Sequence, residues 1–185
     1  YELLSTYDAN SNVVPMLAEG MPAVSKDGLV YTIPLRKGVK FHNGKEMTSA
    51  DVVASLQRWM EMAPRGKAVA KEIKSLEAKG PNTIVITLNR PYAPLVAHLA
   101  LSNGFAAIMA KDSIATPLTQ FIGTGPYMFK ERKPDQYVQL VRFDGYGGRT
   151  ETASGYGGKR AALLDELRFL PVPNSNTRVD GALSG

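Results

Sequence analysis

The stretch LRKGVKFHNGKEMTSADVVASLQRW, residues 35–59, sets the interpretation of the whole chain. Val39 and Phe41 are β-forming residues that alternate with basic ones, which is typical of the end of a strand. Asn43 and Gly44 follow, and this dipeptide tolerates the positive φ angles of a type I′ turn. The pattern therefore predicts a strand that ends in a tight turn.

A helix is predicted directly after this turn. Thr48 and Asp51 have the spacing of a capping box, with the carboxylate near the positive end of the helix dipole. Apolar residues then recur at helical spacing and predict one buried stripe. They are Val52, Val53, Leu56, Trp59, Met60 and Ala63. Pro64 is expected to end the helix.

The composition is that of one ordinary domain, with 185 residues of which 44% are hydrophobic. The chain has no cysteine, which excludes disulfide scaffolds, cysteine-zinc sites and thiol catalysis. No apolar run reaches the roughly 18 residues of a membrane span, and the first residues lack a signal-peptide pattern. The net charge is +5, but the basic residues are scattered, which favours a solvated surface over a nucleic-acid-binding face.

Periodicity and turn residues predict the remaining elements. Strands are expected at 23–24, 29–35, 73–77, 83–88, from 127 onward, and at 136–143 and 164–170. Helices are expected at 95–101 and 174–185, with a weak helix after 110 and one short helical turn within 1–20. Residues 65–67 are expected to interrupt the regular secondary structure, and residues 149–159 to form an extended surface loop.

The order of these residues resembles the signature of the extracytoplasmic solute-binding proteins of ABC importers, family 5, which includes peptide and nickel binders. The matching positions are Asp27-Gly28-Leu29, Tyr31-Thr32, 35–45, Thr48, Ala50, Asp51, Val52 and Ser55. A second signature is IGTGPYMF at 122–129, followed by matches at 164–170 and 174–185. Gly147 departs from the pattern, because the family has a tryptophan there.

The resemblance implies an α/β (mixed α+β) fold, namely lobe I of a two-lobed periplasmic binding protein-like fold with mixed sheets and flanking helices. Residues 1–118 would form its N-terminal subdomain, and 119–185 part of the central lobe I sheet leading toward the hinge. Family members are several times longer, so the second lobe and a first strand are expected to be absent. We expect exposed apolar surface and an open sheet edge as a result.

The resemblance also implies the function. The chain would be the substrate-binding component of an ABC importer, which captures an oligopeptide, dipeptide or related solute by closure of two lobes and delivers it to the permease. It would not be an enzyme, would need no cofactor and would bind no nucleic acid. It would be periplasmic or lipid-anchored outside the cytoplasm, and a monomer in its full-length form.

Loops at the ends of strands and helices are the candidate ligand-binding positions. Asn103, Gly104 and Phe105 follow the apolar helix, and Gly125 and Tyr127 belong to the second signature. Core packing is the alternative role for the two aromatic residues. Much of the ligand contact in similar proteins comes from the second lobe, so the sequence does not identify the solute.

Two alternative functions are an α/β hydrolase-like enzyme domain and a basic nucleic-acid-binding domain. The sequence offers no catalytic or metal-binding residues. His42 and His98 have no ligand spacing around them and are expected to be structural. Asp165 and Glu166 are adjacent on a predicted strand, so they face opposite sides and cannot act as an acid-base pair.

Overall fold

The computed structural model describes residues 1–184, which form three antiparallel sheets and four α-helices. The first sheet pairs β1 (Ser5–Tyr7) with β2 (Val13–Pro15). The second has the order β3-β4-β6-β5 and consists of β3 (Ala23–Val24), β4 (Val30–Pro34), β5 (Ile73–Ala78) and β6 (Thr83–Leu88). The third pairs β7 (Tyr127–Lys133), β8 (Tyr137–Arg142) and β9 (Glu166–Phe169).

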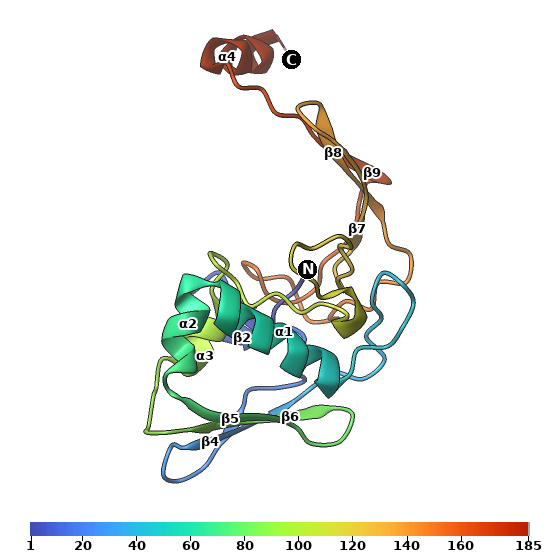
Figure 1. Cartoon of the computed structure of the whole chain (residues 1–185). Coiled ribbons are helices and arrows are strands. Elements are labelled where there is room, and N and C mark those ends of the chain that lie inside the picture. The colour runs from blue at the N-terminus through green and yellow to red at the C-terminus, as the bar shows by residue number, and fades with distance from the viewer. Residues whose placement is uncertain (185) are drawn as a thin grey trace.

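The helices are α1 (Ser49–Met62), α2 (Pro64–Ala70), α3 (Leu95–Ala100) and α4 (Ser175–Ser184). The weak helix expected after residue 110 is a single 3₁₀ turn, η1 (Lys111–Ser113). Figure 1 shows two regions: the first two sheets and α1–α3 lie together, whereas β7–β9 and α4 project away from them. We call residues 127–142 and 166–184 the arm, and the rest of the described chain the body. The mixed helix-and-sheet class is confirmed, while the division at residue 118 stays a prediction.

The turn after Phe41 differs from the predicted type. Gly44 has φ 80°, but no positive φ occurs at Asn43, so a type I′ turn is ruled out. The Gly44 amide donates to the Phe41 carbonyl at 2.8 Å, and the Phe41 amide donates to the Lys45 carbonyl at 2.9 Å. The predicted strand is also wrong, because this segment pairs only through one bridge between Lys40 and Glu46. A three-residue loop with one left-handed glycine explains both differences.

The capping box and the buried stripe of α1 are confirmed. The Asp51 carboxylate accepts the Thr48 amide at 2.9 Å and the Thr48 hydroxyl at 2.6 Å. Along the stripe, Val52, Leu56 and Trp59 are buried. In Figure 1 this helix lies over the four-stranded sheet, and its buried residues share one core cluster with Ile84, Ile86 and Leu88 of β6.

Pro64 ends α1 as predicted, but it also begins α2, so the expected break at residues 65–67 is wrong. A proline fits the first turn of a helix because no intrahelical partner is available for an amide there. Gly66 permits the close approach of the two helices: a Cβ atom at this position would lie 2.0 Å from the Trp59 carbonyl oxygen. Gly66, which was predicted to interrupt the secondary structure, therefore allows the contact between α1 and α2.

The N-terminal segment forms a hairpin in place of the predicted helical turn. The Asp8 carboxylate accepts the amides of Asn10 at 2.9 Å and Asn12 at 2.8 Å, which folds the loop between β1 and β2. Ala18 then makes a bridge to Leu35 instead of entering a helix. The side-chain turn and this long-range pairing outweigh the local helical tendency.

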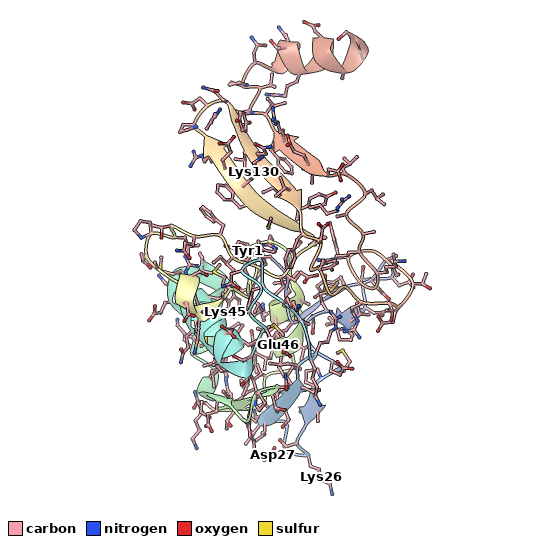
Figure 2. All side chains as sticks on the ribbon, turned by 90° about the vertical axis from the view of Figure 1, so that its right-hand side faces the viewer. Tyr1, Lys26, Asp27, Lys45, Glu46 and Lys130 are labelled. Carbon is pink, nitrogen blue, oxygen red and sulfur yellow. The ribbon has the colours of Figure 1, made fainter. Side chains whose placement is uncertain are left out.

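The predicted strands on either side of Gly28 pair with each other, as do those on either side of Gly80, and Figure 2 shows Lys26 and Asp27 at the far end of the body. Pro34 lies at the end of β4, beyond the residues that pair with β3. β3 does not extend to this position, so the N–H group that Pro34 lacks is not needed for a bond to β3. Prolines in sheets are found at such unpaired positions.

The arm is confirmed as three strands and a helix, apart from Gly185, which lies outside the described residues, but it buries little. No residue of α4 is buried, and Asn174 caps this helix by accepting the amides of Asn176 and Thr177. Phe169 is 60% exposed and Leu183 is 81% exposed. Exposed apolar side chains are therefore present in this region, in line with the expectation from the sequence.

Candidate functional site

A buried carboxylate organises the surface where the arm leaves the body. Glu2 is 3% exposed and lies on an extended segment that bridges to Ile108. Its side chain accepts the hydroxyl of Thr124 at 2.9 Å and the hydroxyl of Tyr146 at 2.8 Å. A guanidinium nitrogen of Arg160 lies 3.4 Å from the same carboxylate. Glu2 thus joins residues that come from three distant parts of the sequence.

The electrostatics of this cluster keep its donors in place. Burial raises the pKa of the Tyr146 hydroxyl well above its usual range, and the negative charge of Glu2 raises it further. Tyr146 therefore remains a hydrogen-bond donor at neutral pH. Arg160 also donates to the Tyr156 carbonyl at 2.7 Å, so one guanidinium connects the carboxylate to an exposed aromatic residue.

A hollow of about 160 Å³ opens beside this cluster. It is lined by Tyr1, Glu2, Leu3, Thr6, Ser102, Phe105, Tyr156 and Arg160. Phe105 is 42% exposed and Tyr156 is 64% exposed, so two aromatic rings stand at the opening. Figure 2 shows Tyr1 at the junction between body and arm, which places the hollow there. Exposed rings beside a few polar groups are the composition of a ligand-binding surface.

The loop that carries Tyr146, Tyr156 and Arg160 is anchored to the body. The Arg149 guanidinium donates to the carbonyls of residues 16 and 18 at 3.2 and 2.9 Å, and the Arg36 guanidinium donates to those of residues 147 and 148 at 2.8 and 2.9 Å. Residues 149–159 form the expected surface loop, with no helix or strand and with most residues exposed, and Arg149 ties this loop to the body. The glycines of the loop allow close packing that the composition alone does not reveal.

The loop of Asn103, Gly104 and Phe105 is held from the body as well. Arg65 donates to the Asn103 carbonyl at 2.7 Å, and the Trp59 indole donates to the Gly104 carbonyl at 2.8 Å. Gly104 has φ 60°, a value that favours glycine. The carbonyls of Asn103 and Gly104 are thus hydrogen-bonded to the body. Of the three loop residues, Phe105 lines the hollow.

Gly125 and Tyr127 take part in the turn that leads from the body into the arm. The Gly125 carbonyl lies 3.0 Å from Nε2 of His42, and the Gly123 amide donates to Nδ1 at 3.3 Å. The Tyr127 hydroxyl accepts the Leu164 amide at 3.1 Å. Neither Gly125 nor Tyr127 lines the hollow that Phe105 borders, so the structure does not bring all five predicted positions into one surface.

His42 makes long-range hydrogen bonds, whereas His98 contacts a nearby residue. Burial lowers the pKa of His42, whose neutral ring accepts one amide and donates to one carbonyl. His98 stacks on Tyr92 with ring centroids 5.8 Å apart, and its Nε2 lies 2.9 Å from the Tyr92 hydroxyl. Between residues 1 and 184, no group of three or more His, Cys, Asp and Glu side chains is arranged to hold a metal ion.

Sequence reasoning did not find Glu2, Arg160 or Tyr156. These residues lie up to 158 positions apart, and no spacing rule links them. The one available signal was Tyr146, which keeps its place in the family pattern. A buried glutamate in the first strand-like segment becomes recognisable only when its donors are located.

The chain matches the model of the bacterial extracellular solute-binding proteins, family 5, over residues 12–185. The chain belongs to this family. The predicted resemblance and its lobe-like fold are therefore confirmed, and this family consists of solute-binding proteins rather than enzymes. Within the part of the chain that the structure describes, no helix is long and apolar enough to cross a membrane.

Two curated relatives and one solved structure illustrate the similarity. The "Probable peptide ABC transporter periplasmic-binding protein y4tO" of Sinorhizobium fredii is 31% identical over 90% of this chain and 32% of its own length. "Heme-binding protein A" of Haemophilus influenzae is 35% identical over 91% of this chain and 34% of its own length. The periplasmic binding protein DppA of Helicobacter pylori, solved with the peptide STSA, matches with a TM-score of 0.82 and 30% identity over 100% of this chain and 39% of that one.

The chain thus spans about a third of the length of these two curated relatives. Their names assign peptide and heme to similar proteins, so membership of the family leaves the solute open. All three names describe binding proteins, and those of the Sinorhizobium fredii and Helicobacter pylori proteins place them in the periplasm.

Proposed function

We propose that this chain forms one ligand-binding wall of a solute-binding subunit that serves an ABC importer, and that its solute is an oligopeptide or dipeptide. The observation that carries the proposal is the similarity over the whole chain to a binding protein in complex with a peptide. The similarity to a relative named for peptide transport supports the same class. The subunit would act in the periplasm, free or lipid-anchored, and pass its solute to the permease.

The hollow at the junction of body and arm is the proposed contact surface. Phe105 and Tyr156 would pack against apolar side chains of a peptide, while Arg160 would face its polar groups. Glu2 already accepts three donors, so its role would be to orient Arg160 and Tyr146. Asn103, Gly104, Gly125 and Tyr127 are proposed to frame this surface through their loops, with a second wall completing the site.

No residue arrangement favours the hydrolase-like or nucleic-acid-binding alternatives over this proposal within residues 1–184. Of the residues that line the hollow, Glu2 and Arg160 belong to a hydrogen-bond cluster with Thr124 and Tyr146 instead of to a nucleophile beside an oriented base. Binding followed by closure, without bond cleavage, is the mechanism that fits this surface.

Native mass spectrometry of the protein purified from its own cells tests the ligand class. We expect a retained peptide, released on denaturation and identified by its fragment masses. Retention of heme or of a metal chelate, with no peptide, would contradict the proposed class while leaving the binding role intact.

A pair of matched variants tests the surface in that same natural protein. Phe105 and Phe121 are 42% and 41% exposed, but only Phe105 lines the hollow. We expect Phe105→Ala to weaken peptide binding at least tenfold in calorimetry, because the ring loses its ligand contact. Phe121→Ala should bind as the unchanged protein does, and equal effects of the two variants would contradict the proposed surface.

A further inference from the structure

A second hollow, of about 270 Å³, lies between α1 and the segment from Gly104 to Met109. Phe105 lines it as well as the first hollow, so the two openings adjoin the same ring. Its wall is formed mainly by Ser55, Arg58, Trp59, Met62, Phe105 and Met109. Arg58 is the one charged residue among the described residues of this wall, and no acidic side chain is among them.

The guanidinium of Arg58 lacks the partners that the other arginines near these hollows have. Its Nε atom is buried and has no hydrogen-bond partner, and no carboxylate among residues 1–184 lies within ion-pair distance of it. Arg160 is paired with Glu2, and Arg65 is bonded to Asn103. Glu61 is one turn further along α1, but it is exposed and forms no ion pair with Arg58. Arg58 lines the hollow and forms no ion pair among residues 1–184, so an acceptor from a ligand would be favourable at its guanidinium.

The other polar groups of the wall are already satisfied within the protein. The Ser55 hydroxyl donates to the Asp51 carbonyl at 2.7 Å and accepts the Met109 amide at 2.9 Å. The Trp59 indole donates to the Gly104 carbonyl. Arg58 is therefore the polar group with unused capacity, and it is surrounded by aromatic and methionine side chains.

We propose that this hollow binds a small carboxylate that carries an apolar body, with Arg58 as the anion-binding residue. A guanidinium presents two parallel N–H groups that match the two oxygens of a carboxylate. The apolar body would pack against Trp59, Met62 and Phe105. The proposal does not depend on which solute the first hollow takes.

The test uses benzoate as the carboxylate and benzamide as its uncharged analogue, added to the 185-residue chain labelled with ¹⁵N. Trp59 is the one tryptophan of the sequence, so its indole N–H gives a single assigned signal in the wall of the hollow. We expect this signal to shift saturably with benzoate, with a Kd in the millimolar range. Benzamide should bind at least tenfold more weakly.

Three substitutions separate the charge from the shape of the hollow. Arg58→Gln should weaken benzoate binding at least tenfold and leave the response to benzamide unchanged. Arg58→Lys should retain weaker benzoate binding, because it keeps the charge but loses the paired N–H groups. Arg132→Gln removes the same charge from β7, outside this wall, and should bind benzoate as the unchanged chain does.

Equal shifts with benzoate and benzamide, unchanged benzoate binding in Arg58→Gln, or a linear response without saturation would each overturn the proposal. If Arg58→Gln lost the dispersed spectrum of a folded chain, the salt dependence of the unchanged chain would decide. Benzoate binding should weaken as sodium chloride is raised, whereas an apolar interaction alone would not weaken in this way.

Discussion

The body and the arm are both built from hydrogen-bonded elements, but nearly all of the buried side chains belong to the body. In the body, α1 and the four-stranded sheet enclose side chains such as Phe41 and Ile84, which are 1% and 0% exposed. In the arm, β7–β9 pair regularly, yet α4 has no buried residue and Phe169 is 60% exposed. The difference shows that regular backbone pairing indicates an element's type and says little about its stability, which depends mainly on burial.

The largest expected contrast comes from truncating one phenylalanine in each region. Phe41→Ala should lower the free energy of unfolding by about 3–5 kcal/mol, because it leaves a cavity in the core. Phe169→Ala should change it by less than about 0.5 kcal/mol, because that ring is mostly in water already. Urea unfolding followed by circular dichroism measures both. Similar losses would mean that the arm is as well packed as the body.

A glycine substitution in each region gives a second contrast. Gly66→Ala should destabilise the chain by about 3 kcal/mol, because the added methyl group overlaps the Trp59 carbonyl and forces α1 and α2 apart. Gly181→Ala meets nothing within 4 Å in α4 and should favour the helix by up to about 1 kcal/mol. Urea unfolding measures the first change, and the helical signal of α4 residues in NMR spectra measures the second. Destabilisation by the alanine in α4 would show that this face is packed.

Two arginines that bind backbone carbonyls allow a third comparison. The Arg149 side chain is 10% exposed, and Arg149→Ala should cost about 2 kcal/mol because it leaves carbonyls of the body unsatisfied. Arg178→Ala removes bonds to the carbonyls of residues 172 and 173 in the exposed arm, where water replaces them at almost no cost. Hydrogen exchange should accelerate across residues 144–160 in the first variant. Unchanged exchange there would contradict the anchoring role of Arg149.

The smallest expected effect is a pH dependence at the junction of the two regions. His42 must be neutral to accept the Gly123 amide, and burial lowers its pKa below the ordinary value of 6.5. Its contribution to stability should therefore be complete above pH 6.5 and be lost as the pH falls through the lowered pKa.

NMR titration of the His42 ring measures this midpoint, and the amide signals of residues 123–127 should move with it. His42→Asn should remove the pH dependence of these signals. A midpoint at or above 6.5 would contradict the role assigned to the buried neutral ring.

Local sequence patterns predicted the structure correctly where the spacing of the residues itself sets the geometry. Thr48 and Asp51 are three residues apart and cap a helix whose stripe is buried as expected. The same local logic failed at Gly66, because a glycine that reads as a break serves instead to bring two helices together. It predicted residues 149–159 as a surface loop but not the contacts that anchor the loop, because Arg149 makes them with segments about 130 residues away.

The candidate site could be predicted from the sequence only in part, for the same reason. Phe105 was predicted because it follows a helix in a loop with Gly104, which is a local feature. Glu2 and Arg160 meet only after the body has folded, and their separation in sequence carries no pattern. Sites assembled from distant, individually unremarkable polar residues require the fold before they can be recognised.

The order of the four-stranded sheet has a consequence for how the chain folds. The central pairing joins Ile33 to Ile84, which lie about fifty residues apart in sequence, and all of α1 and α2 lie between them. Closing so long a loop is entropically unfavourable, so the hairpin of β5 and β6 and the helix α1 should acquire structure before β4 joins them. The rate of folding of the body should accordingly respond most strongly to changes at the β4–β6 interface.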